Sequence, residues 1–261
     1  MVRLRIPTLF FLFIAAPASA TLIPVTSERE VSVSARSSRE YVEPETITDA
    51  DAQTSLVPGA FSAFVDSQIA REGAAPLSTA EQTSQVGGGG VTATGSASAL
   101  GTGFSDEFDG ASSGGVSRLD LIFDLAAPTP YAMALTFAAG ANFLDQSTGF
   151  FFSELTLGLD GGAPLIDIRC DLVEGFGPEI TCFDQTEICA TSFDPTCGEY
   201  ERDGVLAAGR YALSLQASAG SLGSSSDGTS SYDLALVVPE PRRLVWMTLA
   251  GVFFARRRLR R

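Results

Sequence analysis

Four cysteines are the residues of this 261-residue chain whose types and spacing point most directly to chemistry. They fall within 28 residues in the pattern C-x11-C-x6-C-x7-C, as Cys170, Cys182, Cys189 and Cys197. Zinc sites built on cysteine usually contain a closely spaced Cys pair or added histidines, and the sequence has neither. We therefore expect two disulfides with three possible connectivities, and no bound metal or other cofactor.

Acidic residues are the remaining candidate ligands. Within residues 170–197 they are Asp171, Glu174, Glu179, Asp184, Glu187 and Asp194. A disulfide-held acidic loop suits Ca²⁺ or a partner, but this spacing matches no calcium template, which favours a disulfide-ordered insertion. Residues 106–110 look like a calcium loop, yet Ser105 and Val116 stand where an EF-hand needs its first and last ligands. Residues 87–90 lack the Lys-Ser/Thr of a phosphate-binding loop and are predicted to form a turn or a bulge.

The chain contains few of the residue types that usually act in catalysis, because it has no His and no Lys. Those absences remove the usual general base, the Ser-His-Asp triad and Schiff-base chemistry. Among the 31 acids, two carboxylates could meet as in a glycosidase, but no short motif marks a pair. One ring of Phe150, Phe151 and Phe152 could face outward to stack on a sugar, with the others in the core. We expect a non-catalytic protein; the alternatives are a carbohydrate- or Ca²⁺-binding module and, further, a secreted hydrolase that uses carboxylates.

The charge of the chain is unevenly distributed. All 17 basic residues are Arg, and residues 21–238 hold only eight of them against 30 acids, a formal charge of −22. Such an acidic body repels nucleic acid and anionic lipid, so we expect no nucleic-acid partner.

The N-terminus is typical of a secretory signal peptide over residues 1–20. Arg3 and Arg5 precede an apolar run at residues 9–16, and Ala18 and Ala20 supply the small residues of a cleavage site. The apolar run is too short to span a bilayer. Signal peptidase is therefore expected to leave Thr21 as the first residue of the exported protein.

The C-terminus combines three features over residues 238–261. The segment begins with Val238, Pro239, Glu240 and Pro241, continues as an apolar stretch at residues 244–255, and ends in an Arg cluster that includes Arg256, Arg257 and Arg258. Twelve helical residues rise only ~18 Å, and snorkelling Arg side chains with local bilayer thinning would make up part of the remaining thickness. The positive-inside rule keeps the Arg cluster cytoplasmic and places the acidic body outside.

This tail resembles the PEP-CTERM sorting signal, although Arg242 and Arg243 stand where that family usually has small or apolar residues. The resemblance implies recognition by exosortase, an integral membrane protease of Gram-negative bacteria that make exopolysaccharide. It therefore implies transient residence in the inner membrane and then a secreted or cell-surface location, in association with exopolysaccharide or biofilm.

Between the two ends, several segments alternate apolar and polar residues with period two, which predicts half-buried strands. They are residues 31–35, 117–125, 131–137, 155–159, 211–215 and 232–238, with a weaker case at 91–99. Residues 60–71 fit a helix or a strand, residues 218–231 suggest a mobile Ser/Gly hairpin loop, and residues 21–58 are expected to be extended or partly disordered. Residues 21–237 are thus predicted to form one antiparallel β-sandwich, jelly-roll-like in topology.

A second resemblance supports the sandwich. Residues 206–211 read Leu-Ala-Ala-Gly-Arg-Tyr and are similar to the Leu-x-Ala-Gly-x-Tyr strand that commonly closes PEP-CTERM ectodomains. Residues 80–84 are similar to an early strand of such domains. Neither similarity implies an activity.

Overall fold

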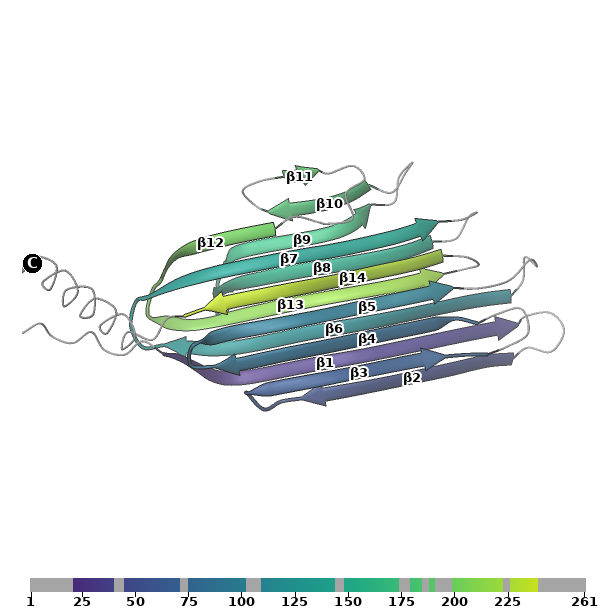
Figure 1. The fold of residues 1–261 in the computed structure, drawn as a ribbon, viewed down its shortest axis with the longest axis horizontal. Helices are drawn as coiled ribbons and strands as arrows, with labels where there is room; N and C mark the ends of the chain where they lie inside the picture. The colour runs from purple at the N-terminus through teal and green to yellow at the C-terminus, as the bar shows by residue number, and fades with distance from the viewer. Residues whose placement is uncertain are drawn as a thin grey trace, which may run out of the picture.

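The computed structural model describes residues 21–39, 45–70, 75–101, 109–143, 148–173, 179–184, 188–190, 199–222 and 226–238, whose regular structure is entirely β-strand (Figure 1). In chain order the strands are β1 (Leu22–Arg39), β2 (Glu45–Ser55), β3 (Ala60–Gln68), β4 (Leu77–Gly87), β5 (Gly90–Gly101), β6 (Asp109–Leu125), β7 (Thr129–Phe143), β8 (Thr148–Leu159), β9 (Pro164–Val173), β10 (Glu179–Asp184), β11 (Ile188–Ala190), β12 (Glu199–Leu206), β13 (Gly209–Leu222) and β14 (Ser226–Val237).

These strands form two antiparallel sheets. One has eight strands in the order β11-β10-β9-β8-β13-β6-β1-β2, and the other has six in the order β12-β7-β14-β5-β4-β3. One buried apolar cluster contains residues from both sheets, so the two sheets pack face to face. This confirms the all-β class and the two packed antiparallel layers predicted from the period-two pattern.

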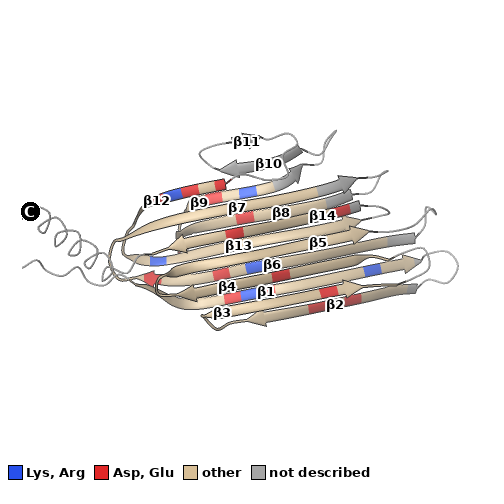
Figure 2. Ribbon diagram, viewed as in Figure 1, with Lys and Arg blue, Asp and Glu red and all other residues tan. Residues whose placement is uncertain are grey.

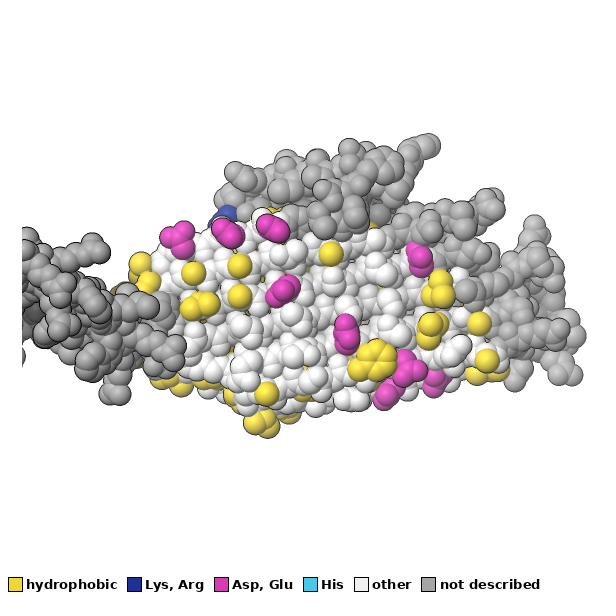
Figure 3. Space-filling view, in the orientation of Figure 1, with side chains coloured by type: hydrophobic (Ala, Val, Ile, Leu, Met, Phe, Trp, Pro, Cys, Tyr) yellow, Lys and Arg dark blue, Asp and Glu magenta, His cyan; other side chains and the backbone are white. Residues whose placement is uncertain are grey.

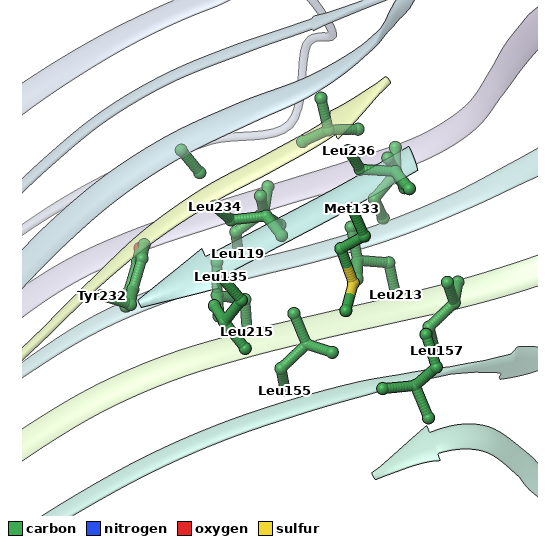
Figure 4. Packing of buried hydrophobic residues seen from close by; sticks show 14 of the residues in the cluster. Leu119, Met133, Leu135, Leu155, Leu157, Leu213, Leu215, Tyr232, Leu234 and Leu236 are labelled. Atoms are coloured by element: carbon green, nitrogen blue, oxygen red, sulfur yellow. The ribbon is translucent and has the colours of Figure 1, made fainter. Parts of the chain in front are cut away.

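Alternation along each strand sends apolar side chains inward. In β6, Leu119 and Leu121 are buried. Arg118 and Asp120 alternate with them on the other face, where Arg118 Nε and Asp120 Oδ2 form an ion pair at 2.5 Å. Leucines of β6, β8, β13 and β14 meet Met133 and Leu135 of β7 between the layers (Figure 4). Each fully buried side chain of this size stabilises the fold by roughly 1.5–3 kcal/mol, so this half of the sandwich carries most of the hydrophobic stabilisation.

The other half of the sandwich is packed with small residues. A separate buried cluster there consists of Ala97, Ala99 and Ala219. A Cβ added at Gly115 of β6 would lie 2.7 Å from the carbonyl oxygen of Thr79 on the facing sheet, so the sheets approach closely at this point. Small side chains are what permit this approach.

The Ser/Gly run at residues 218–231 belongs to this thin half, and its prediction as a mobile loop is wrong. β13 continues to Leu222 and β14 begins at Ser226, so only residues 223–225 lie outside the described strands. Buried serines of these strands hydrogen-bond to other strands: Ser221 to Ser113 at 3.0 Å and Ser230 to Ser153 at 2.5 Å. Composition indicated a loop because Ser and Gly are common in loops, but here they fill a narrow space between sheets.

The remaining secondary-structure predictions also have clear outcomes. Residues 60–68 form β3, with Ala63 and Val65 buried and Phe64 exposed, so the helical alternative for residues 60–71 is wrong. The weak case at residues 91–99 is confirmed as part of β5, and residues 22–39 and 45–55 form β1 and β2.

The Leu-Ala-Ala-Gly-Arg-Tyr segment makes the crossover from β12 to β13. The hydroxyl group of Tyr211 donates a hydrogen bond to the carbonyl oxygen of Ala207 at 3.0 Å. The Tyr211 ring stacks on Phe123, with centroids 5.6 Å apart, and Leu206 is buried beside the core. A tyrosine that ties its hydroxyl to the backbone a few residues upstream stabilises the corner where a chain passes between the sheets of a sandwich.

Candidate functional site

Two residues next to the predicted processing points, Leu22 and Val238, are hydrogen-bonded to the same turn, at residues 88–89. The backbone N–H of Leu22 donates to the carbonyl oxygen of Gly88 at 3.2 Å, and that of Val238 donates to Gly89 at 2.9 Å. Thr21 is half-buried and Val238 is completely buried. The rest of the sorting and cleavage residues lie outside the described residues: Ala18, Ala20, Pro239, Glu240, Pro241, Arg256, Arg257 and Arg258. No helix within the described part of the chain is long and apolar enough to cross a membrane.

The register of the strands aligns three of the four cysteines. Cys182 on β10 stands directly opposite Cys170 on β9 and, on its other side, opposite Cys189 on β11. The Cys170 side chain is fully buried. Cys197 lies outside the described residues. Cys170, Cys182 and Cys189 thus form a row across three strands, in which Cys182 is next to both of the others.

The candidate cation sites gain no support from the described residues. Asp109 begins β6, and residues 106–108 lie outside the described part. Residues 87–90 form the predicted turn, with Gly90 at a φ of 138°. Across the described ranges, no group of three or more His, Cys, Asp or Glu side chains is placed to hold a metal ion.

The three consecutive phenylalanines alternate as strand geometry requires. Phe151 is buried in the core, whereas Phe150 and Phe152 lie on the outer face of the eight-stranded sheet. The Phe150 ring, 55% exposed, covers Gly220, where an added Cβ would clash with it. The Phe152 ring carries the Arg169 guanidinium 4.6 Å from its centroid. Each outward ring therefore already has a partner within the protein.

Next to this aromatic–cation contact lies a carboxylate with a shifted pKa. Glu154 on β8 stands opposite Arg169 on β9. Partial burial raises the pKa of Glu154; the positive charge of Arg169 opposes that rise, and the negative charge of Asp167 adds to it. Glu154 and Asp167 are therefore a carboxylate pair in which one acid makes the other harder to ionise.

The outer face of the six-stranded sheet is hollowed over β3, β4, β5 and β14. The hollow has a volume of about 400 Å³ and is lined mainly by small polar and Ala side chains. Figure 3 shows this face of the molecule, on which acidic and hydrophobic side chains are scattered among other side chains and backbone. Across its floor, Thr83, Thr94 and Asp233 stand opposite one another on three adjacent strands. Gln85 and Thr92 form the neighbouring row.

This hollow offers hydroxyl, amide and carboxylate groups that can form hydrogen bonds. The Ser62 and Thr83 hydroxyl groups lie 3.4 Å apart, and one row further on Ser96 donates to the Glu81 carboxylate at 3.1 Å. Register sets Asp233 and Glu81 two strands and two residues apart, about 12 Å between Cα atoms from sheet geometry. The arrangement suits a hydroxyl-rich ligand lying across the strands. Sequence reasoning missed these residues, although the outward Thr92 and Thr94 alternation was a usable signal.

The described strands form an all-β protein of two packed antiparallel sheets. Comparison of the chain with protein-family models, with curated proteins and with solved structures gives no significant match. Function must therefore be argued from the residues themselves.

Proposed function

We propose that this protein is an exported, non-catalytic cell-surface or extracellular-matrix component that exosortase sorts through its C-terminal tail. The observation that carries the proposal is the order Pro-Glu-Pro, apolar segment, Arg cluster within residues 239–261. A cleaved signal peptide at residues 1–20 and a C-terminal membrane helix at residues 244–255 belong to it. The proposal also includes a jelly-roll-like topology for the sandwich. It is supported by the connections that cross from one sheet to the other, at β2–β3, β5–β6, β6–β7, β7–β8, β11–β12, β12–β13 and β13–β14.

The positions of Leu22 and Val238 support a processed protein. Each lies next to a predicted cleavage region, and each is hydrogen-bonded to the turn between β4 and β5. Val238 is also buried and belongs to the apolar core, so we expect the folded body to extend to this residue. Removal of residues beyond Val238 would therefore leave the sandwich intact.

Mass spectrometry of the mature protein tests this proposal. We expect Thr21 at the N-terminus and a C-terminus at or just beyond Val238, without the Arg cluster. Pro239→Ala combined with Glu240→Ala should leave the precursor in the inner membrane. Glu28→Ala combined with Pro128→Ala, which removes an exposed Glu and Pro from the body, should not. Intact Arg261 on the mature surface protein would contradict the proposal.

The hollow on the six-stranded sheet favours one accompanying function, binding of exopolysaccharide. Its hydroxyl, amide and carboxylate groups can exchange hydrogen bonds with sugar hydroxyls, and its flat floor suits an extended chain. Calorimetry with the host polysaccharide should show binding that Thr94→Ala with Asp233→Asn weakens at least tenfold. Thr26→Ala with Asp160→Asn, at exposed positions outside the hollow, should leave binding unchanged. No heat of binding with the unmodified protein would exclude this function.

A further inference from the structure

Large apolar side chains are exposed at one end of the sandwich. Ile23 and Val25 begin β1, Leu159 ends β8, Leu165 begins β9, Val205 lies near the end of β12, and Val237 ends β14. Between 42% and 68% of each side chain is exposed. Register brings these positions to the same end, because Leu22 pairs with Leu125, Leu159 with Tyr211, and Val237 with Gly90. We call this end the apolar pole.

The turns of the apolar pole carry almost no charge. They consist of residues 88–89, 126–128, 160–163 and 207–208, which are Gly, Ala and Pro apart from Asp160. Nearby, Arg210 holds Asp124 through two hydrogen bonds of 2.9 and 3.1 Å, so these two charges cancel. A body with a formal charge of −22 therefore presents an end that is nearly free of net charge.

Apart from Asp160 and Asp124, the acidic residues of the described strands lie further along the sheets, several of them on the edge strands (Figure 2). Asp49 and Asp51 lie on the edge strand β2, and Glu199 and Glu201 on the edge strand β12. Charged edges deter pairing with other chains, and a polar face keeps the body soluble. At the apolar pole the described charges are limited to Asp160 and the Arg210–Asp124 pair, so the exposed apolar side chains there have little of this protection.

The chain leaves the sandwich at this same pole. Val238 is held by Gly89 there, and only residues 239–243 separate it from the apolar segment at 244–255. Five residues span at most ~18 Å. If that segment lies in the bilayer, the pole cannot be further than this from the membrane interface.

We propose that the apolar pole rests on the lipid bilayer, so that the sandwich stands end-on with its strands directed away from the membrane. This inference rests on the proposed function, since it requires the C-terminal segment to be membrane-embedded. Ile23, Leu165 and Val205 would enter the interfacial region, while the acidic edges would stay clear of lipid headgroups. The occupant is lipid rather than a second copy, because the tail fixes this end against the membrane.

Photo-crosslinking to lipid tests the orientation in the full-length chain, purified from a host without exosortase and reconstituted in phosphatidylcholine vesicles. A benzophenone amino acid is placed at Val205 or Val237 of the pole, at Leu249 of the tail, or at the exposed Phe64 or Leu100 away from the pole. Lipid adducts are quantified by mass spectrometry. We expect adducts at Val205, Val237 and Leu249, at least fivefold above those at Phe64 and Leu100.

The outcomes separate this inference from the proposed function. Adducts at Leu249 with only background at Val205 and Val237 would overturn pole docking and leave the tail in the membrane. Background at Leu249 as well would overturn both. As a second measurement, Ile23→Ser with Leu165→Ser should reduce the Val205 adduct several-fold, because apolar contact is lost, whereas Phe64→Ser with Leu100→Ser should not. An unchanged Val205 adduct in the first pair would also count against docking.

Discussion

The hydroxyl groups of Ser117 and Tyr232 lie 3.0 Å apart in the interior of the sandwich and join its two sheets. Ser117 comes from β6 and is fully buried, and Tyr232 comes from β14. Burial raises the pKa of Tyr232, and the hydrogen bond to Ser117 only partly opposes the rise. The phenol therefore stays neutral and hydrogen-bonded. The pair lies where the large-residue core meets the small-residue half.

Removing the Tyr232 hydroxyl should destabilise the protein. Tyr232→Phe leaves the buried Ser117 hydroxyl without this partner, and we expect a loss of ~1–3 kcal/mol in the free energy of unfolding. Urea denaturation measures it. Ser117→Ala combined with Tyr232→Phe should cost less than the sum of the single changes, because they share one hydrogen bond. Tyr131→Phe, a partly buried control, should cost little; strict additivity of the pair would contradict the interpretation.

Gly95 makes room for this contact. It stands opposite Tyr232 on the neighbouring strand β5, and a Cβ at Gly95 would clash with both the Ser117 hydroxyl and the Tyr232 ring. We expect Gly95→Ala to lower stability by at least ~1–3 kcal/mol, the usual cost of overpacking a core. Gly87→Ala is the matched control, because a Cβ there meets nothing within 4 Å. Equal melting temperatures for the two variants would show that the contact can relax freely.

Sequence periodicity succeeded where side chains are large and failed where they are small. Leu119, Leu121 and Phe123 on β6 alternate with polar residues, and this contrast in hydropathy reveals both the strand and its buried face. In residues 218–231 the same alternation exists, since Ser221 and Ser230 are buried, but Ser and Gly on both faces give no contrast. Close approach of the sheets, a tertiary property, is what makes those residues strand-forming.

The candidate site was harder to predict for a related reason. Thr83, Thr94 and Asp233 come together only through the order β4-β5-β14, which places a C-terminal strand beside two early ones. Sequence spacing carries no information on that order. The cysteine row across β9, β10 and β11 is different, because a local meander aligns it, and the close spacing of the cysteines anticipated their proximity.

The raised pKa of Glu154 predicts a pH dependence of stability. A carboxyl group whose pKa is higher in the folded than in the unfolded state binds its proton more tightly when folded. Its contribution is therefore fully present below the ordinary carboxyl pKa of 4.5 and is lost as pH rises through the raised value. Glu154→Gln should raise the melting temperature relative to the unmodified protein at neutral pH, with a gain that disappears below pH 4.5. Glu28→Gln, which removes an exposed carboxylate, should give a smaller change; identical pH profiles would contradict this role for Glu154.

The register of β9, β10 and β11 predicts the disulfide connectivity. Residues directly opposite in antiparallel strands have Cα atoms ~4.5–5.5 Å apart, within the ~4.4–6.8 Å range that disulfides bridge. Cys170 and Cys189 lie two strands apart, roughly 9.5 Å, which is too far. Cys170 is fully buried, and its two cross-strand neighbours are Ser153 and Cys182, so Cys182 is the cysteine that the register places directly beside it. We therefore expect Cys170 bonded to Cys182, and Cys189 to Cys197.

Peptide mapping of the exported protein without reduction measures this pairing. Acidic residues separate all four cysteines, so cleavage at Asp and Glu gives peptides that each carry one of them: Asp171 and Glu179 follow the first, Asp184 and Glu187 the second, and Asp194 the third. Each bridge should stabilise the fold by ~2–4 kcal/mol, so Cys170→Ser with Cys182→Ser should lower the melting temperature. Ser153→Ala, which leaves every cysteine in place, should not change the peptide map. A disulfide-linked peptide that contains Cys182 and Cys189 would show that Cys182 is bonded to its other neighbour in the row. A Cys170–Cys189 peptide, or four free thiols in the unfolded protein, would contradict the register as the source of the pairing.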